Sequence, residues 1–350
     1  MLSETEAALR RLPELRTHAR ADLDLRRTSI DPLARLGARW GIDLWVKRDD
    51  TLPLAMGGNK VRQLEYYLGP ALEQGADTLL ITGAIQSNFV RLAAAAARRL
   101  GWQAHVQLEQ RVPRDDSIYN TSGNVLLNKL FGAEIHYFNE GENEAAADAN
   151  LDRIASRLQQ QGRHPYVVHL GTEHPPLGAL GYALCAAECY DQCQSEGQSP
   201  DHIVIPSGSG LTHAGFLAGA RAIGWQIPVH GICVRRNAGL QHSRIEQRYR
   251  ETLALLGKQT PVAADDIRVD DNVLPPGYGQ LNDAVRDAMQ HCAEDEALLL
   301  DPVYSGRTMA GVKSLIEQGV IQHNDSVLFI HTGGLPALFA YQHDLTPADI

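Results

Sequence analysis

Short apolar runs alternate with helical patterns along most of this chain, and the alternation limits the folds it can adopt. The apolar runs cover residues 44–48, 77–82, 105–108, 134–138, 166–170, 202–205, 229–234 and 327–330. Helical patterns lie between most of them, for example at residues 90–100, 144–161 and 177–193. Strands joined by helices pair in parallel through right-handed crossovers, and strands buried on both faces can be apolar throughout. The sequence therefore predicts an α/β protein with mainly parallel sheets.

The chain is long enough for two domains and has an ordinary globular composition. It has 350 residues, of which 44% are hydrophobic and 21% are charged. Its formal net charge of −10 argues against a general surface for nucleic acid or anionic membranes. We find no apolar stretch that would span a bilayer and no apolar signal core, so we expect a cytoplasmic protein. Because no linker is visible, two domains would have to be interleaved.

Three of the five cysteines recur at four-residue spacing on a predicted helix: Cys185, Cys189 and Cys193. Thiolates on one helix face could bind a metal ion. However, no Cys-x-x-Cys pair or nearby fourth ligand supports such a site, and cysteine is commonly a small buried residue. We interpret the three as packing residues and expect neither a metal site nor a disulfide framework.

One lysine is notable for the glycine-rich sequence before it. Lys60 follows Gly57, Gly58 and Asn59, between a predicted strand and a helical pattern. Glycine permits backbone conformations that other residues avoid, and it lets a ligand approach closely. A lysine in this position can form a Schiff base with a carbonyl compound such as pyridoxal phosphate. This segment alone also allows a surface lysine after a glycine turn.

A second glycine-rich segment, residues 207–215 (SGSGLTHAG), follows a predicted strand and opens a helix. Backbone N–H groups in such a segment form a cradle for an anion, and Ser209 and Thr212 add hydroxyl donors. The segment fails the dinucleotide fingerprint because His213 stands where the third glycine is needed, and it lacks the P-loop lysine. It indicates a phosphate site for a mononucleotide-sized cofactor, or a tight turn without a ligand.

Four further turns contain polar side chains. Ser87 and Asn88 (GAIQSN) could contact a ligand or cap the following helix. Tyr278 (PPGYG) and Tyr304 (DPVYSG) could steer or transfer a proton, or pack as ordinary aromatic residues. Thr332 (HTGG) offers a neutral hydroxyl, or it bonds its own backbone.

Seven motifs in this order resemble the D-cysteine desulfhydrase and aminocyclopropane-carboxylate deaminase family: KRDD, MGGNK, GAIQSN, SGSGLTHAG, PGYG, DPVYSG and HTGGLPALFAY. The resemblance runs from Leu44 to Tyr341. It implies a pyridoxal-phosphate enzyme of the tryptophan-synthase-β-like fold (fold type II), with two interleaved three-layer α/β/α domains. The larger, cofactor-binding domain would comprise residues 1–56 and 168–350, and the smaller residues 57–167, with the active site between them. Because members of this family are generally dimers, the resemblance also implies a homodimer.

The resemblance implies roles for residues at the cofactor. Lys60 matches the lysine that binds pyridoxal 5'-phosphate covalently. Asn88 matches the residue at the ring hydroxyl of the cofactor, and Thr332 matches the small hydroxyl residue near its pyridine nitrogen. The remaining residues that we expect around the cofactor, mostly in the phosphate site, are Asn59, Gly208, Ser209, Gly210, Leu211 and Thr212.

The implied reaction is β-elimination from a small β-substituted amino acid, D-cysteine or a related sulfur-containing one. The products would be pyruvate, ammonia and the leaving group. Lys60 would be the base that removes the Cα proton, with Ser87 as the second candidate. Ser87 would also lie beside the substrate carboxylate, and Tyr278 and Tyr304 would face the substrate. A neutral Thr332 near the pyridine nitrogen favours elimination.

Two departures from the family, and one position that distinguishes its subfamilies, bear on the substrate. Phe89 replaces a histidine, and residues 172–176 (TEHPP) replace part of a loop that normally lies near the substrate. Phe89, Glu173 and His174 could contact a less usual substrate such as cysteate, although Glu173 and His174 could equally face solvent. Ser305 replaces the glutamate of the deaminases, which disfavours aminocyclopropane-carboxylate deaminase activity. Two competing hypotheses are a non-catalytic cofactor-binding protein and a nucleotide-binding oxidoreductase.

Overall fold

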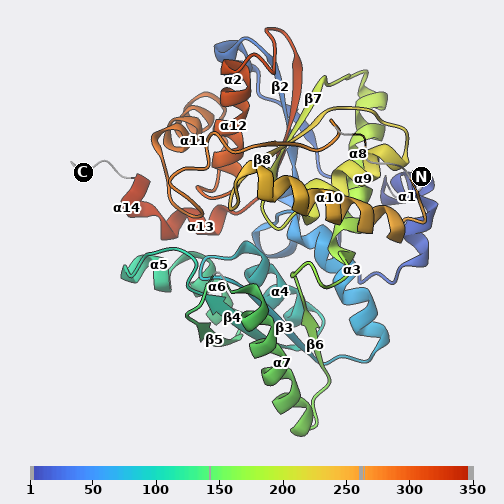
Figure 1. Ribbon diagram of the computed structural model, residues 1–350, viewed down its shortest axis with the longest axis vertical. Helices are drawn as coiled ribbons and strands as arrows, with labels where there is room; N and C mark the ends of the chain where they lie inside the picture. Colours follow the sequence, from blue (N-terminus) through green and yellow to red (C-terminus); the bar gives the residue numbers. More distant parts are fainter. Residues whose placement is uncertain (1–3, 142, 260–262, 264, 346–350) are drawn as a thin grey trace.

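The computed structural model describes residues 4–141, 143–259, 263 and 265–345, and its strands form two sheets in separate lobes (Figure 1). The larger sheet has the strand order β1-β2-β10-β7-β8-β9, and the smaller has the order β5-β4-β3-β6. In the larger sheet β1 pairs antiparallel with β2, and the other neighbours are parallel; the smaller sheet is parallel throughout its described strands. The predicted α/β fold with mainly parallel sheets is confirmed.

Helices cover both faces of the smaller sheet. Leu79 and Ile81 of β3 pack with the alanine-rich α4, whereas Leu80 between them packs with α7. Because successive side chains of a strand point to opposite faces, this pattern gives three layers. The strands are β3 (Thr78–Ala84), β4 (Gln103–Glu109), β5 (Glu134–Phe138) and β6 (Pro165–Val168). The helices are α4 (Asn88–Arg99), α5 (Ser117–Thr121), α6 (Gly123–Leu130) and α7 (Glu144–Gln160).

The larger sheet is also covered on both faces. Ile203 and Ile205 of β7 pack with α8, α9 and α10, whereas Val204 packs with α2, α11 and α12. The strands are β1 (Ile30–Pro32), β2 (Asp43–Arg48), β7 (His202–Ser207), β8 (Val229–Cys233), β9 (Arg268–Asp270) and β10 (Ser326–His331). The helices are α2 (Ala34–Trp40), α8 (Leu177–Glu196), α9 (Leu211–Ala222), α10 (Ala238–Leu255), α11 (Asp283–Glu296) and α12 (Ser305–Glu317).

Helix α3 (Lys60–Glu73) lies between the lobes and packs against α8 (Figure 1). The two helices approach closely at Gly181, where a Cβ atom would lie 2.1 Å from the carbonyl oxygen of Arg62. The first residue of α3 therefore has a fixed position between the two sheets. The remaining elements are α1 (Glu4–Arg11), η1 (Pro13–Thr17), η2 (Asp49–Thr51), η3 (Leu54–Met56), α13 (Leu335–Ala340) and α14 (Gln342–Leu345).

Two segments differ from what their local sequence favours. Helix α3 continues through Gly69 and Pro70, although a Gly-Pro pair favours a kink or a break. Residues 259–280 have an irregular sequence that favours a loop, yet they contain β9; residues 260–262 and 264 lie outside the described residues. The three cysteines of α8 are buried in the core beside the larger sheet, as expected. The domain boundaries at residues 57 and 167 stay a prediction. Among the described helices, none is both long and apolar enough to cross a membrane.

Candidate active site

A cavity of about 1060 Å³, including its opening to solvent, lies where the two lobes meet. Its walls come from the start of α3 and from segments that follow strands β3, β7, β8 and β10. Parallel α/β sheets commonly bind ligands at the carboxyl ends of their strands. The structure brings most of the predicted site residues to this cavity: Asn59, Lys60, Ser87, Asn88, Phe89, Gly208, Ser209, Gly210, Thr212, Tyr278, Tyr304 and Thr332.

Lys60 is the first residue of α3 and faces the cavity. Its Nζ donates to Oε1 of Gln63 at 3.3 Å and lies 4.9 Å from the ring centroid of Phe89. Burial disfavours the charged ammonium and lowers the pKa of Lys60 to about 7. A substantial fraction of the amine is therefore neutral at neutral pH, which is the form that attacks a carbonyl carbon.

The glycines before Lys60 are required by close backbone contacts. Gly57 has a φ of +62°, and a Cβ atom there would lie 2.2 Å from the carbonyl oxygen of Asp50. Gly58 has a φ of +119°, and its Cβ would lie 2.9 Å from the carbonyl oxygen of Thr332. The backbone N–H of Asn59 donates to the same oxygen at 3.1 Å. These contacts join the MGGNK and HTGG motifs, which are far apart in sequence, at one edge of the cavity.

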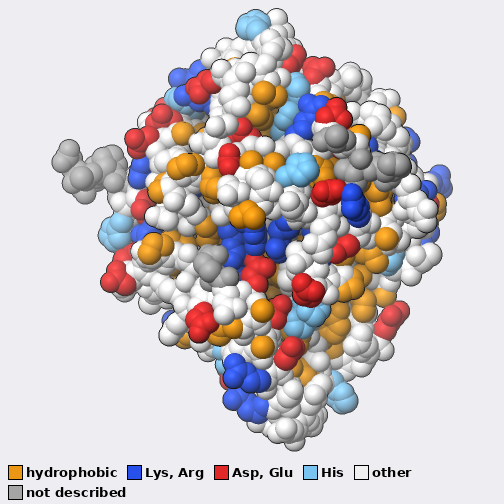
Figure 2. All heavy atoms as spheres, in the orientation of Figure 1, with side chains coloured by type: hydrophobic (Ala, Val, Ile, Leu, Met, Phe, Trp, Pro, Cys, Tyr) orange, Lys and Arg blue, Asp and Glu red, His pale blue; other side chains and the backbone are white. Residues whose placement is uncertain are grey.

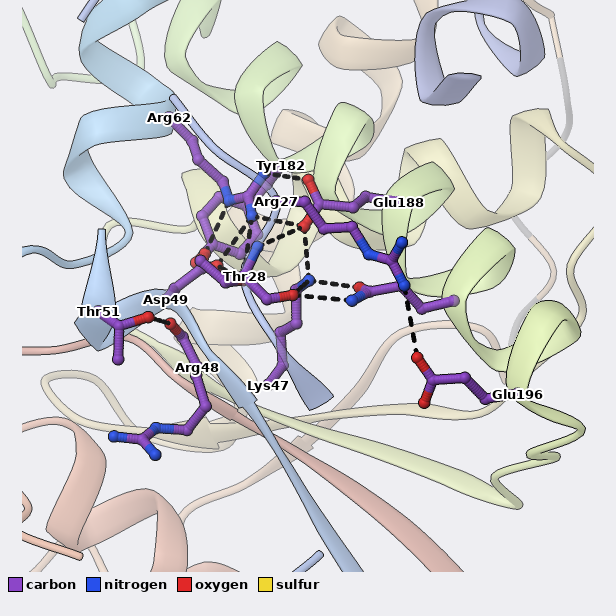
Figure 3. Close-up of polar contacts among 11 residues, drawn as sticks. Arg27, Thr28, Lys47, Arg48, Asp49, Thr51, Arg62, Tyr182, Glu188 and Glu196 are labelled. Atoms are coloured by element: carbon purple, nitrogen blue, oxygen red, sulfur yellow. Dashed lines mark hydrogen bonds and ion pairs between the residues drawn. The ribbon is translucent and has the colours of Figure 1, made fainter. Parts of the chain in front are cut away.

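A buried network of charges holds α3 behind Lys60 (Figure 3). Arg62 donates to both carboxylate oxygens of Asp49 at 2.9 Å, and to Glu188 on α8 at 2.9 Å. Lys47 on β2 donates to Glu188 at 2.5 Å. Although burial opposes ionisation, Arg62 and Lys47 lower the pKa of Glu188 to about 2. The KRDD motif therefore has a structural role, because it ties β2, α3 and α8 together behind the reactive lysine.

Residues 208–212, which we call the phosphate loop, comprise the turn after β7 and the first two residues of α9. Gly210 has a φ of +96°, and α9 begins at the next residue, so backbone N–H groups without helical partners lie at the cavity. The hydroxyl of Thr212 accepts from Asn59 at 2.9 Å and from Gln63 at 2.8 Å. Its own hydrogen is thus left to donate to a ligand. Leu211 is buried in the core, so only its backbone can serve the site.

Ser87 and Asn88 begin α4, at the end of β3. The Oγ of Ser87 accepts from the backbone N–H of Val90 at 3.2 Å, so Ser87 caps the helix and also lines the cavity. Asn88 accepts from the side chain of Asn124 at 2.8 Å, which fixes the orientation of its amide. Both interpretations of Ser87, as a cap and as a cavity residue, are compatible with this geometry.

Tyr278 and Tyr304 meet at the cavity. Their hydroxyl oxygens are 3.0 Å apart, and their rings pack edge to face. Burial raises the pKa of Tyr304 well above its usual range, so its hydroxyl stays protonated. The carboxylate of Asp301 accepts from the backbone N–H of Tyr304 at 3.0 Å and from the hydroxyl of Ser305 at 2.6 Å. Ser305 is buried outside the cavity lining, so it affects the site through the position of Tyr304.

Two predicted substrate residues do not line the cavity. Glu173 is exposed, and His174 stacks on His169 with ring centroids 4.0 Å apart. Their loop is held through its backbone, because Arg248 donates to the carbonyl oxygen of His174 at 2.7 Å and to that of Leu170 at 3.3 Å. Glu173 therefore faces solvent, whereas His174 packs against the neighbouring histidine.

Several cavity residues were not anticipated from the sequence. Arg111 makes two 2.8 Å contacts with Glu109, and Glu109 accepts from the hydroxyl of Thr82 at 2.5 Å. Thr82 lies in the last part of β3, Glu109 ends β4 and Arg111 lies two residues beyond it, positions near strand ends that could have marked them. The other charged residues that line the cavity are Glu144, Asp148, Arg235 and Arg244.

Comparison with known proteins gives consistent matches. Residues 21–333 match the sequence profile of a family described as pyridoxal-phosphate dependent enzyme. A D-cysteine desulfhydrase of Salmonella choleraesuis is 40% identical over 314 residues, which cover 90% of this chain and 93% of the relative. One of Serratia proteamaculans is 41% identical over 327 residues, covering 92% and 96%.

Solved structures give the same result for the fold. The crystal structure of an ACC deaminase homologue matches with a TM-score of 0.84 and 31% identity, covering 96% of this chain and 98% of the other. Diaminopropionate ammonia lyase of Escherichia coli matches with a TM-score of 0.64 and 16% identity, covering 98% and 92%. The second similarity supports the fold alone.

Proposed function

This chain belongs to the family of pyridoxal-phosphate dependent enzymes, and on that premise we propose that it acts as a D-cysteine desulfhydrase. The reaction converts D-cysteine and water into pyruvate, ammonia and hydrogen sulfide. One observation carries the proposal: Lys60, with a pKa of about 7, faces the same cavity as the phosphate loop. The relatives that are 40% identical over 90% of the chain bear the name of this activity.

The residues present fit the cofactor. Lys60 supplies an amine that is readily neutral, which suits covalent attachment to an aldehyde. The phosphate loop supplies backbone donors at a helix N-terminus, and a Cβ atom at Gly208 would lie 2.9 Å from the side chain of Val234. Asn88 and Thr332, which also line the cavity, supply an amide and a neutral hydroxyl for the ring.

Lys60 is the group best suited to move the Cα proton. When bound, pyridoxal phosphate supplies an electron sink for the negative charge that develops at Cα. An amine with a pKa near 7 is close to the optimum for a base at neutral pH, because it is often deprotonated yet still accepts a proton. Ser87 is the less suitable base, since its oxygen already accepts the N–H of Val90.

The start of α4 is suited to hold the substrate carboxylate. Ser87 keeps its own hydroxyl hydrogen to donate, and the first N–H groups of a 12-residue helix favour an anion at this point. Phe89 forms an apolar wall beside Lys60 and is 5% exposed. These contacts would orient the Cα–H bond and exclude water from the amine.

The two tyrosines are suited to the departing sulfur. Tyr304 keeps its proton because burial raises its pKa, and it lies 3.0 Å from the hydroxyl of Tyr278. One hydroxyl can donate to the sulfur while the other donates to its neighbour. Such a pair stabilises negative charge that develops on the leaving group during elimination.

A substrate panel tests the function. The purified protein, loaded with pyridoxal phosphate, is assayed for both sulfide and pyruvate with D-cysteine, L-cysteine, L-cysteate, β-chloroalanine, diaminopropionate and aminocyclopropane carboxylate. We expect equal amounts of sulfide and pyruvate from D-cysteine. The variant Lys60→Ala should release neither product. Pyruvate from another substrate without sulfide from D-cysteine would contradict the proposed specificity.

We also propose a cytoplasmic homodimer. Exposed apolar side chains on α6 and α13, two helices that pack together, support a contact between copies: Leu126, Leu130 and Phe339 are 46%, 71% and 56% exposed. A symmetric dimer would bury the same face on both copies. Light scattering should give about twice the 38.3 kDa chain mass, and Leu130→Glu should lower it. A wild-type monomer would contradict this arrangement.

A further inference from the structure

Three arginines gather around one carboxylate at the mouth of the cavity, and we call them the arginine cluster: Arg235, Arg236 and Arg244. They come from the larger lobe, whereas Glu144 is the first residue of α7 in the smaller lobe. Glu144 accepts from Arg235 at 2.8 Å and from Arg236 at 2.6 Å, and it lies 3.5 Å from Arg244. Figure 2 shows basic and acidic side chains side by side at the boundary between the lobes.

Two members of the arginine cluster, Arg236 and Arg244, also contact the backbone of the phosphate loop. Arg236 donates through Nη1 to the carbonyl oxygen of Gly208 at 3.2 Å, and Arg244 donates through Nε to that of Ser209 at 2.8 Å. Gln241 adds a 3.1 Å contact to the oxygen of Gly208. Both arginines therefore reach from the carboxylate of Glu144 to the backbone of the loop.

These contacts fix the orientation of two peptide groups. In a trans peptide the C=O bond and the N–H bond of the following residue point in opposite directions. The carbonyl oxygens of Gly208 and Ser209 point toward the arginines. The N–H groups in the same two peptides, those of Ser209 and Gly210, therefore point away from the arginines. Ser209 and Gly210 line the cavity, so N–H groups that are turned away from the arginines could donate to a phosphate bound in the loop.

The positions of the arginine side chains depend on the negative charge of Glu144. Burial, together with repulsion among the neighbouring guanidinium groups, lowers the pKa of Arg236 and lowers that of Arg244 to about 10. Although burial favours protonation of Glu144, Arg244 and Arg236 lower its pKa below the usual range. Neutralising Glu144 would remove the charge of the carboxylate that Arg236 and Arg244 both contact and would favour movement of these two side chains toward solvent.

We propose that Glu144, Arg236 and Arg244 are positioning residues for the cofactor phosphate, acting through the carbonyl groups of Gly208 and Ser209. The smaller lobe thereby contributes to phosphate binding without touching the phosphate. This inference rests on the family's cofactor and not on the identity of the amino-acid substrate.

Comparing two ligands separates this role from a general structural one. The cofactor-free protein is titrated with pyridoxal phosphate and with pyridoxal, which lacks the phosphate. For Glu144→Gln we expect the affinity for pyridoxal phosphate to fall about tenfold or more, as for loss of charged hydrogen bonds, while the affinity for pyridoxal changes little. Arg236→Gln and Arg244→Gln should act in the same direction, since each removes one carbonyl contact.

Matched controls lie on α10. Arg250 and Glu246 form an exposed ion pair on the same helix as Arg244, so Arg250→Gln and Glu246→Gln test loss of charge away from the loop. Both should bind the two ligands as the wild type does. Arg244→Lys keeps the charge but lacks the planar fork needed to reach both Ser209 and Glu144, so it should restore only part of the affinity.

Three outcomes would overturn the proposal. One is unchanged affinity for pyridoxal phosphate in the Glu144 variant and in both arginine-to-glutamine variants that fold. Another is an equal loss for both ligands, and the third is a wild-type protein that does not prefer the phosphorylated ligand. A wild type that binds pyridoxal phosphate but releases no sulfide from D-cysteine would refute the proposed function and leave this inference standing.

Discussion

The depressed pKa of Lys60 predicts a specific dependence of stability on pH in the cofactor-free protein. The folded-state pKa is about 7, against an ordinary value of 10.5 in the unfolded chain. Between these values the unfolded state holds a proton that the folded state has lost, so the free energy of unfolding rises with pH by about 1.36 kcal/mol per unit. The full shift corresponds to about 5 kcal/mol. Well below pH 7 both states are protonated and the penalty is constant.

The variant Lys60→Met removes this titration and keeps an apolar side chain of similar length. Urea unfolding of cofactor-free wild type and variant, measured from pH 6 to pH 9, gives the difference in their free energies of unfolding. The variant should gain about 2 kcal/mol relative to wild type between pH 9 and pH 7, and only a few tenths of a kcal/mol more between pH 7 and pH 6. Lys129→Met, on the exposed surface of α6, controls for loss of a lysine. If the free energies of unfolding of wild type and Lys60→Met changed equally with pH, the reasoning would be refuted.

Three further substitutions test other parts of the site. Gly58→Ala forces a Cβ atom to within 2.9 Å of the carbonyl oxygen of Thr332 at a φ of +119°, so unfolding in denaturant should show a loss of about 1–3 kcal/mol. Tyr304→Phe removes a hydroxyl 3.0 Å from that of Tyr278, so kcat for sulfide release should fall about 100-fold with the melting temperature little changed. Glu188→Gln removes the carboxylate partner of the buried Lys47 and one of the two carboxylate partners of Arg62, so it should cost about 3–5 kcal/mol in the free energy of unfolding.

Each of these expectations has a contrary result. Gly58→Ala with wild-type stability would show that the backbone near Thr332 adapts without strain. Tyr304→Phe with unchanged kcat would exclude the tyrosine pair from proton delivery. Glu188→Gln with wild-type stability would mean that water reaches the network and screens its charges.

The parts of the site that sequence could predict are those set by short-range rules. The phosphate loop and the segment before Lys60 combine glycines with a neighbouring strand and helix, and the reasons for those glycines are local backbone conformation and close approach. The order of the motifs then identified the family. By contrast, the continuous path of α3 through Gly69 was not predictable. Gly69 is required by the N-terminal segment, since a Cβ there would lie 2.1 Å from the carbonyl oxygen of Ala19.

The charged cavity residues were missed because their meaning depends on contacts between distant segments. From its neighbours in sequence, Glu144 is only an acidic residue in the first turn of a helix, which is a common and favourable position. Arg235 and Arg236 follow a strand, and Arg244 lies on a helix that the periodicity did not reveal. Short strands were missed for a related reason. β1 and β9 each span three residues, too few to show a pattern, and Pro32 lies in β1.

The loop after β6 is held through its backbone, so its side chains can vary while the fold is kept. Arg248 donates hydrogen bonds to the carbonyl oxygens of Leu170 and His174, and every residue type supplies such an oxygen. The side chains between these points are therefore under little constraint from the fold. A library randomised at positions 172 and 173, with Arg248 retained, should yield mostly folded variants. This loop can therefore accept sequence changes next to the cavity residues Leu170 and Gly171 without loss of the fold.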